Sequence, residues 1–265
     1  MPDHPRHGAA NETCPWSGKP VRPDGLTLYR GRVVGFCNPG CRDKFDAATA
    51  RFDAALDQET GPTLLALAGV RSAPPSLEDA VLVVLDAQGE YRLGTLPLDG
   101  VDAALGRIAA LLARARELGA PVLHVAHRGR PGGPFDRAGP GGAILDEAAP
   151  APGEPVVEKG LPNAFAETDL RERVAAMGRG HLVLAGFMTH MCVAATARAA
   201  LDSGLRATVA ADATATRALP DPLGGAAVTA VEVQRATLAA LADRIAAVVP
   251  VAAFGDGGGA PGYGR

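Results

Sequence analysis

The chain has 265 residues, a formal net charge of −3 and no stripe of basic residues. Hydrophobic residues make up 47% of it, yet no apolar stretch approaches the roughly 20 residues of a membrane span. These features argue against a nucleic-acid-binding or membrane protein. The N-terminus is polar and lacks an apolar leader segment, which predicts a cytoplasmic location. The length allows one large domain, or a domain of about 180–190 residues with a small module.

Residues 11–55 differ in composition from the rest and predict a separate small module. They hold the cysteines Cys14, Cys37 and Cys41, three of the four in the chain. Thiolates near a hairpin and at the start of a helix can converge on one metal ion, typically zinc or copper. A bound ion would also stabilise a segment with so little core. Three thiols without a metal are the alternative.

Residues 56–78 contain several prolines and glycines and predict a linker. From residue 79 to 254 apolar runs alternate with helical periodicity, whereas the Gly/Pro-rich segments 128–155 and 255–265 predict an irregular loop and a disordered tail. The alternation predicts a three-layer α/β/α fold with a mostly parallel sheet. The predicted strands are 80–85, 121–127, 155–158, 182–187 and 206–211, and the predicted helices are 101–118, 169–177, 193–203 and 226–248.

Three reactive side chains follow predicted strands. Asp86 follows the first strand, Lys159 the third and Cys192 the fourth. In open α/β sheets ligands bind at the carboxyl ends of the strands, so these residues are expected to share one edge. Singly, a turn cap, a surface amine and a core thiol would explain them. Cys192 also precedes a predicted helix, whose positive end would favour a thiolate.

Residues 79–250 resemble the isochorismatase-like cysteine hydrolases. The resemblance rests on Leu85-Asp-Ala-Gln88, on Val157-Glu-Lys-Gly-Leu-Pro-Asn-Ala-Phe165 and on Gly186-Phe-Met-Thr-His-Met-Cys-Val193. It implies a catalytic triad, a cis peptide bond and an oxyanion hole made of two backbone N–H groups. By this resemblance the triad is Asp86, Lys159 and Cys192, the cis bond is Phe187–Met188, and the N–H groups belong to Met188 and Cys192.

The predicted activity is hydrolysis of a small amide, ureide or lactam through a thioester on Cys192, without a cofactor. Lys159 would stabilise the thiolate, and Asp86 would transfer the proton. A zinc-assisted nicotinamidase is disfavoured because Tyr91 to Leu98 contains no histidine, and a true isochorismatase would lack the cysteine. A pair of Cys192 with His190 is the alternative mechanism. The candidate pocket residues are His127, Phe135, Phe165 and His190.

The N-terminal module resembles the YHS/TRASH group of small metal-binding modules. The resemblance lies in the aromatic residue before Cys37 and in the helix start Cys41-Arg-Asp-Lys-Phe45, while Ser17 stands where many relatives carry a fourth thiol. The alternative function is a metal-sensing or metal-carrying protein with an inactive larger domain. The complete set of Asp86, Lys159 and Cys192 favours the enzyme. Family resemblance further implies a homo-oligomer, a dimer or a tetramer.

Overall fold

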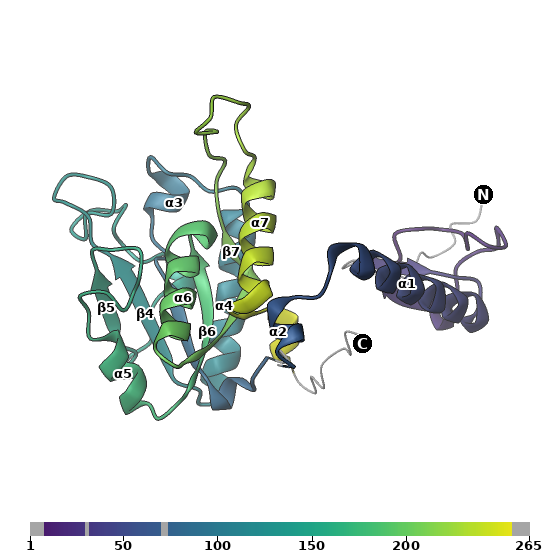
Figure 1. The fold of residues 1–265 in the computed structure, drawn as a ribbon, viewed down its shortest axis with the longest axis horizontal. Helices are drawn as coiled ribbons and strands as arrows, with labels where there is room; N and C mark the ends of the chain where they lie inside the picture. The colour runs from purple at the N-terminus through teal and green to yellow at the C-terminus, as the bar shows by residue number, and fades with distance from the viewer. Residues whose placement is uncertain (1–7, 30–31, 70–73, 256–265) are drawn as a thin grey trace. The chain divides into compact units, whose positions relative to one another are not determined.

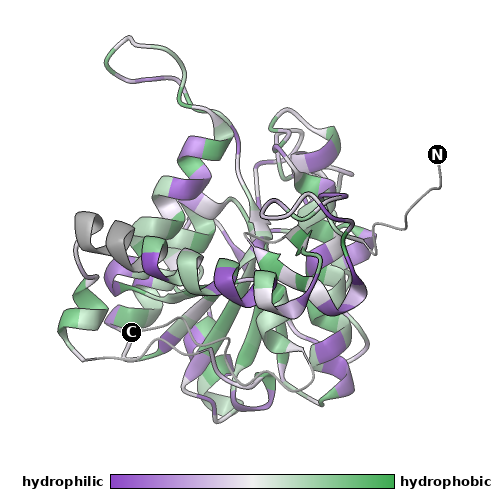
Figure 2. Cartoon of the chain, turned by 90° about the vertical axis from the view of Figure 1, so that its right-hand side faces the viewer, coloured by the Kyte–Doolittle hydropathy of each residue, from purple (hydrophilic) through white to green (hydrophobic). Residues whose placement is uncertain are grey.

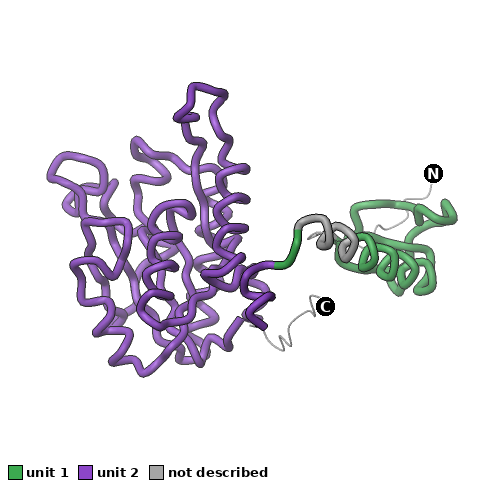
Figure 3. Tube along the Cα trace, viewed as in Figure 1, with its two compact units in different colours: residues 1–62, 264–265 green, residues 63–263 purple. Residues whose placement is uncertain are grey.

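The chain divides into two compact units. The structure is a computed structural model that describes residues 8–29, 32–69 and 74–255. The chain passes from the first unit to the second between Pro62 and Thr63 (Figure 3). The predicted boundary at residue 55 falls inside helix α1, Pro39–Thr60, and most of the predicted linker belongs to the second unit. The predicted tail, apart from Gly255, lies outside the described residues.

The first unit is a short hairpin followed by one helix. Strands β1 (Leu26–Tyr29) and β2 (Arg32–Gly35) pair antiparallel. Helix α1 begins after Asn38, whose side-chain oxygen accepts the backbone N–H of Cys41 at 2.9 Å and so caps the helix. Phe36 and two cysteines form the small buried core of this unit. The cap therefore fixes the first turn of α1, which carries Cys41.

The second unit contains a six-stranded sheet in which all neighbouring strands run parallel (Figure 1). The strand order is β5-β4-β3-β6-β7-β8, so the two central strands are β3 and β6. Every residue of these two strands is buried, as expected for strands covered on both faces. The strands are β3 (Val81–Leu85), β4 (Val122–His127), β5 (Val156–Lys159), β6 (His181–Phe187), β7 (Arg206–Ala215) and β8 (Ala247–Val249).

Helices cover both faces of this sheet. Helix α4 packs with alternate residues of the central strands in one hydrophobic cluster, and α5, α6 and α7 pack with the other residues in a second. Figure 2 shows the apolar strands enclosed between helices with hydrophilic outer residues. The predicted three-layer α/β/α fold is therefore confirmed. The helices are α2 (Leu64–Leu67), α3 (Glu90–Leu93), α4 (Val101–Glu117), α5 (Leu170–Ala176), α6 (Ala194–Asp202) and α7 (Ala230–Arg244).

The C-terminal part differs from the prediction of one helix over 226–248. Helix α7 begins only after Thr229, which forms a capping box with Glu232, and it ends before Ile245. The chain then forms β8, which pairs with β7 as the last strand of the sheet. Two consecutive β-branched residues, Val248 and Val249, suit a strand better than a helix. Among the described residues, no helix has the length and apolar character needed to cross a membrane.

Candidate active site

The central strands bring Asp86 and the segment with Cys192 to the same edge of the sheet. Leu85 of β3 pairs with Gly186 of β6, and Asp86 follows directly with a left-handed φ of 48°. Gly186 has φ 113°, and a Cβ atom there would overlap the carbonyl oxygen of Leu85. Only glycine allows this approach of the two backbones. Asp86 is 0% exposed, and Cys192 is 4% exposed.

Lys159 joins these two side chains. It is the last residue of β5, one residue inside the strand whose predicted end was residue 158. Its Nζ atom lies 2.7 Å from Oδ2 of Asp86 and donates a hydrogen bond to Sγ of Cys192 at 3.2 Å. The three side chains, one at the end of β5, one directly after β3 and one in the turn after β6, therefore form one buried cluster of an amine, a carboxylate and a thiol.

Burial dominates the ionisation of this cluster. It raises the pKa of the Cys192 thiol to about 12, and the charge of Asp86 acts in the same direction, while Lys159 opposes both. The helix start and Lys159 were expected to favour a thiolate, but removal of the sulfur from water acts against them and keeps the pKa of the thiol high. Burial also raises the pKa of Asp86, although Lys159 and the Cys192 thiol oppose it. A neutral thiol thus lies beside a carboxylate that is a stronger base than usual.

The segment between β6 and α6 carries Cys192 in a π-helical turn, Thr189–Val193. The peptide bond between Phe187 and Met188 at its start is cis. The Thr189 hydroxyl donates to the carbonyl of Ala215 at 3.0 Å, which fixes the turn to β7. His190 in this turn is half-buried, and its Nδ1 atom lies 2.6 Å from Oγ1 of Thr216.

His127 and Phe135 also lie at this edge. His127 ends β4, and its Nδ1 atom is 3.4 Å from Nζ of Lys159. The ring of Phe135 contacts His127 edge to face at a centroid distance of 5.2 Å, and it contacts Tyr91 at 5.0 Å. Phe165, by contrast, packs against the hydrophobic cluster of α5 and α6 with the guanidinium of Arg171 over its ring.

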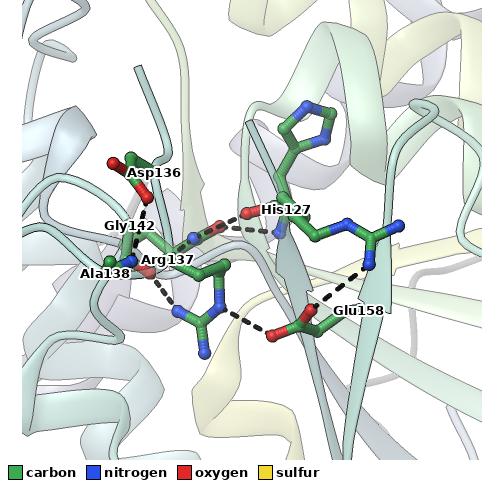
Figure 4. A network of polar contacts seen from close by, with 8 residues as sticks. His127, Asp136, Arg137, Ala138, Gly142 and Glu158 are labelled. Carbon is green, nitrogen blue, oxygen red and sulfur yellow. Dashed lines mark hydrogen bonds and ion pairs between the residues drawn. The ribbon is translucent and has the colours of Figure 1, made fainter. Parts of the chain in front are cut away.

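The predicted irregular loop after β4 is held in place by polar contacts (Figure 4). The amide nitrogen of Gln88 donates to the carbonyls of His127 and Gly142, at 2.9 and 2.8 Å. Arg137 donates to the same Gly142 carbonyl and pairs with Glu158 at 3.1 Å. The loop is therefore attached to Gln88, which follows β3, and to Glu158 of β5, and an internal contact between Arg137 and Gly142 fixes its conformation.

Three further residues lie in this region and were not among the predicted site residues. Gln88 is fully buried, and Tyr91 is close enough to the cluster that, after burial, the charges of Asp86 and Cys192 raise its pKa. Arg217 follows the end of β7; burial lowers the pKa of His190, and the charge of Arg217 lowers it further. The predicted strand ended at residue 211, four residues before the end of β7, so the position of Arg217 beside the sheet edge was not recognised.

The three cysteines of the first unit form a second cluster of reactive groups. The Sγ atoms of Cys14, Cys37 and Cys41 all lie within 4.8 Å of one another. Two sulfur ligands of one tetrahedral zinc ion, each at about 2.3 Å, would lie about 3.8 Å apart. The Sγ atoms of Cys37 and Cys41 are separated by 3.8 Å. Ser17 donates to Sγ of Cys37 at 3.1 Å, so this residue contacts a candidate ligand. The donor set thus fits a thiolate-bound metal ion.

Reactive side chains at the carboxyl edge of a parallel sheet lie where α/β enzymes bind their ligands. Comparison with known proteins identifies the chain more closely, because the model of the isochorismatase domain matches residues 80–252. The chain belongs to the isochorismatase family. Members of this family are hydrolases that act on amide carbon–nitrogen bonds and related substrates.

Individual relatives support this assignment. A crystal structure of an isochorismatase from Pseudomonas putida is 41% identical, with a TM-score of 0.70, covering 73% of this chain and 99% of that one. A secreted isochorismatase effector of Verticillium dahliae is 39% identical over 66% of this chain and 90% of its own length. A streptothricin hydrolase of Streptomyces noursei is 35% identical over 73% of this chain and 76% of its own. Because one relative is secreted, a cytoplasmic location stays a prediction.

Proposed function

We propose that the larger unit hydrolyses the carbon–nitrogen bond of a small amide, ureide or lactam, with Cys192 as nucleophile, Asp86 as proton carrier and Lys159 between them. The observation that carries this proposal is the position of Lys159 Nζ, 2.7 Å from Asp86 and 3.2 Å from Cys192. A carboxylate and a thiol that share one buried cation can exchange a proton without leaving a charge unpaired. If the larger unit were an inactive scaffold of a metal-binding protein, nothing would explain why Lys159 lies between Asp86 and Cys192.

The first half of the reaction forms a thioester. The Cys192 sulfur attacks the carbonyl carbon while its proton passes to Asp86, which suits a thiol whose raised pKa keeps it protonated at rest. The tetrahedral intermediate then breaks its carbon–nitrogen bond. Asp86 returns the proton to the departing nitrogen, which leaves as ammonia or an amine. Lys159 keeps its own protons and stabilises whichever of its two neighbours is negative.

The second half releases the acid. Asp86, again a carboxylate, takes a proton from water as the water oxygen attacks the thioester carbon. The carbon–sulfur bond breaks, the proton returns to sulfur, and the carboxylic acid leaves. The backbone N–H groups of Met188 and Cys192 are the proposed donors to the oxyanion in both halves, and the cis bond at Phe187–Met188 lies beside them. None of these steps requires a cofactor.

Arg217 is proposed to bind an anionic group of the substrate. Its Nε atom is buried without a hydrogen-bond partner among the described residues, and its charge lowers the pKa of His190 after burial has done so. For an amide that carries a carboxylate, Arg217→Met should raise KM about 10–100-fold, because a charged hydrogen bond is lost. Steady-state kinetics with an uncharged analogue of the same amide is the control. An equal rise in KM for both amides would contradict this role.

The first unit is proposed to bind one zinc or copper ion through Cys14, Cys37 and Cys41. Burial opposes ionisation of Cys14, but hydrogen bonds from the backbone of Cys37 and from Ser17 lower its pKa to about 6. Burial and the neighbouring thiols raise the pKa of Cys41. One thiol is thus ready to bind as a thiolate near neutral pH, while another must lose a proton to do so.

Metal analysis of the purified full-length protein, after incubation with zinc or monovalent copper, tests this site. We expect one equivalent of metal, bound more weakly as the pH is lowered, because the thiols must release protons. Cys37→Ser should lose the metal, whereas Cys192→Ser should retain it. If both variants bind metal as the parent protein does, the three cysteines do not form the site.

A homo-oligomeric state is a further prediction, which size-exclusion chromatography with light scattering can test.

A further inference from the structure

The ammonium group of Lys159 has a third neighbour that the proposed mechanism does not use. An ammonium carries three N–H donors. The ammonium of Lys159 donates to the sulfur of Cys192 at 3.2 Å and forms an ion pair with the carboxylate of Asp86 at 2.7 Å, and Nδ1 of His127 lies 3.4 Å from the same Nζ atom. The three acceptors come from three different parts of the fold: the end of β3, the turn after β6 and the end of β4. Together they can satisfy every proton of a fully buried amine.

His127 is held by a clamp on its own backbone. The side-chain oxygen of Gln88 accepts the N–H of His127 at 2.8 Å, and its nitrogen donates to the His127 carbonyl at 2.9 Å. Gln88 is fully buried, so this clamp is protected from water. The ring of Phe135 also contacts the His127 ring in an edge-to-face arrangement. Both the backbone and the ring of His127 are therefore fixed before a substrate arrives.

The charged groups that face His127 favour its neutral form. Burial lowers the pKa of His127, and the charge of Lys159 from β5 lowers it further, while the charge of Asp86 from β3 acts in the opposite direction. A protonated imidazole has no acceptor and would place a second cation against Lys159. Only the neutral ring with its proton on Nε2 can accept from Lys159 through Nδ1.

We propose that His127 is a positioning residue, whose neutral ring holds the Lys159 ammonium between the thiol of Cys192 and the carboxylate of Asp86. This inference rests on the proposed function. Without the acceptor, Nζ has a free donor and can move toward Asp86, the closer of its two remaining partners, and away from the sulfur. The expected consequence is a lower rate of the chemical step. Protonation of His127 should also contribute to the acid limit of activity, in addition to protonation of Asp86.

Two substitutions distinguish the role of His127 as a hydrogen-bond acceptor from its ability to take up a proton. In His127→Asn the side-chain oxygen occupies about the place of Nδ1 and cannot be protonated, whereas His127→Leu removes the acceptor. His127→Leu should lower kcat about 10–100-fold, as expected when a reacting group is displaced, with a change in KM of less than about threefold. His127→Asn should stay within about threefold of the parent and should keep its activity at lower pH than the parent.

A histidine far from this edge supplies the matched control. His181 is buried at the opposite end of β6, where it contacts Thr208, so His181→Asn repeats the substitution without approaching Lys159. We expect His181→Asn to leave the acid limit of activity where the parent has it. A parent-like kcat and pH profile in His127→Leu would overturn the proposal, as would an acid limit in His127→Asn identical to that of the parent.

Two readouts do not depend on amide hydrolysis, so failure of the proposed function would be recognised separately. Nitrogen-15 NMR of His127 should show a neutral ring protonated at Nε2, with a pKa that rises in Lys159→Met and falls in Asp86→Asn. Alkylation of Cys192 by iodoacetamide should be slower in His127→Leu, because a displaced Lys159 lowers the thiol pKa less. A ring protonated at Nδ1, or alkylation at the parent rate, would contradict the proposal even in a protein without amidase activity.

Discussion

Cys192→Ala is expected to abolish amide hydrolysis, with kcat reduced on the order of 10⁴-fold or more, because no other described group is placed to form the thioester. Cys192→Ser should be nearly as inactive, since its hydroxyl is a far weaker nucleophile beside the same carboxylate. Initial rates of ammonia or amine release measure both. Thermal unfolding should show a folded protein in each case, because the substitutions remove or exchange a single atom.

The matched control is Val231→Ala. It shortens an exposed side chain on α7 that has no role in the proposed mechanism. Its activity should equal that of the parent. If Cys192→Ala keeps a substantial part of the activity while its fold is intact, the nucleophile is another group. His190→Ala tests the alternative in which His190, and not Asp86, accepts the proton of Cys192. If Asp86 accepts the proton, this variant should still form the thioester and hydrolyse the amide.

Lys159→Met is expected to damage activity and stability together. Activity should fall about 10²–10³-fold, because a positive charge that stabilises the reacting groups is lost. The free energy of unfolding should fall by about 3–5 kcal/mol near neutral pH, because the Asp86 carboxylate remains buried without its partner. Denaturant unfolding measures the second effect. The double variant Asp86→Asn, Lys159→Met should recover most of the stability and none of the activity.

The stability defect of Lys159→Met should depend on pH in one direction. Loss of the cation removes an influence that lowers the pKa of Asp86, so the folded variant holds the Asp86 proton to a higher pH than the parent does. The unfolded chain releases that proton above about pH 3.9. The defect should therefore be smallest at acid pH and grow as the pH rises through the folded pKa of the variant.

Arg128→Met is the control for removal of a cation. The Arg128 side chain is 65% exposed and lies 3.9 Å from Glu158, so its loss should change stability by less than about 1 kcal/mol. A Lys159→Met protein as stable as Arg128→Met at neutral pH would show that Asp86 and Lys159 are not a buried ion pair.

The sequence predicted the edge of the sheet where the cluster lies because two regularities combine there. Continuous apolar runs identify buried parallel strands, and the residues after such strands meet at one edge. These two regularities predict that Asp86, Lys159 and Cys192 lie at one edge, but they do not predict the distances between the three side chains. They failed for β8, whose three residues follow a helix closely and pair only because β7 offers a free edge. Local periodicity does not predict which distant segments pair in a sheet.

The ionisation of Cys192 was not predictable from its neighbours in the chain. A position before a helix and a nearby lysine both favour a thiolate, yet burial of the sulfur outweighs them. The depth of burial depends on packing among β6, the π-helical turn and α6, which no single segment encodes. The contact of Gln88 with His127, 39 residues away, is of the same kind. Arg217 was missed for a simpler reason, because the predicted strand ended at residue 211 whereas β7 continues to Ala215.

The most direct test of the account is mass spectrometry of the protein quenched in acid during turnover of a panel of small amides, ureides and lactams. Acid quenching preserves a thioester, and proteolysis locates it. We predict that a substrate which is hydrolysed leaves its acyl group on the peptide that contains Cys192, and that Cys192→Ala shows neither the adduct nor turnover. Hydrolysis that proceeds without an acyl group on Cys192, and continues in Cys192→Ala, would contradict the central claim.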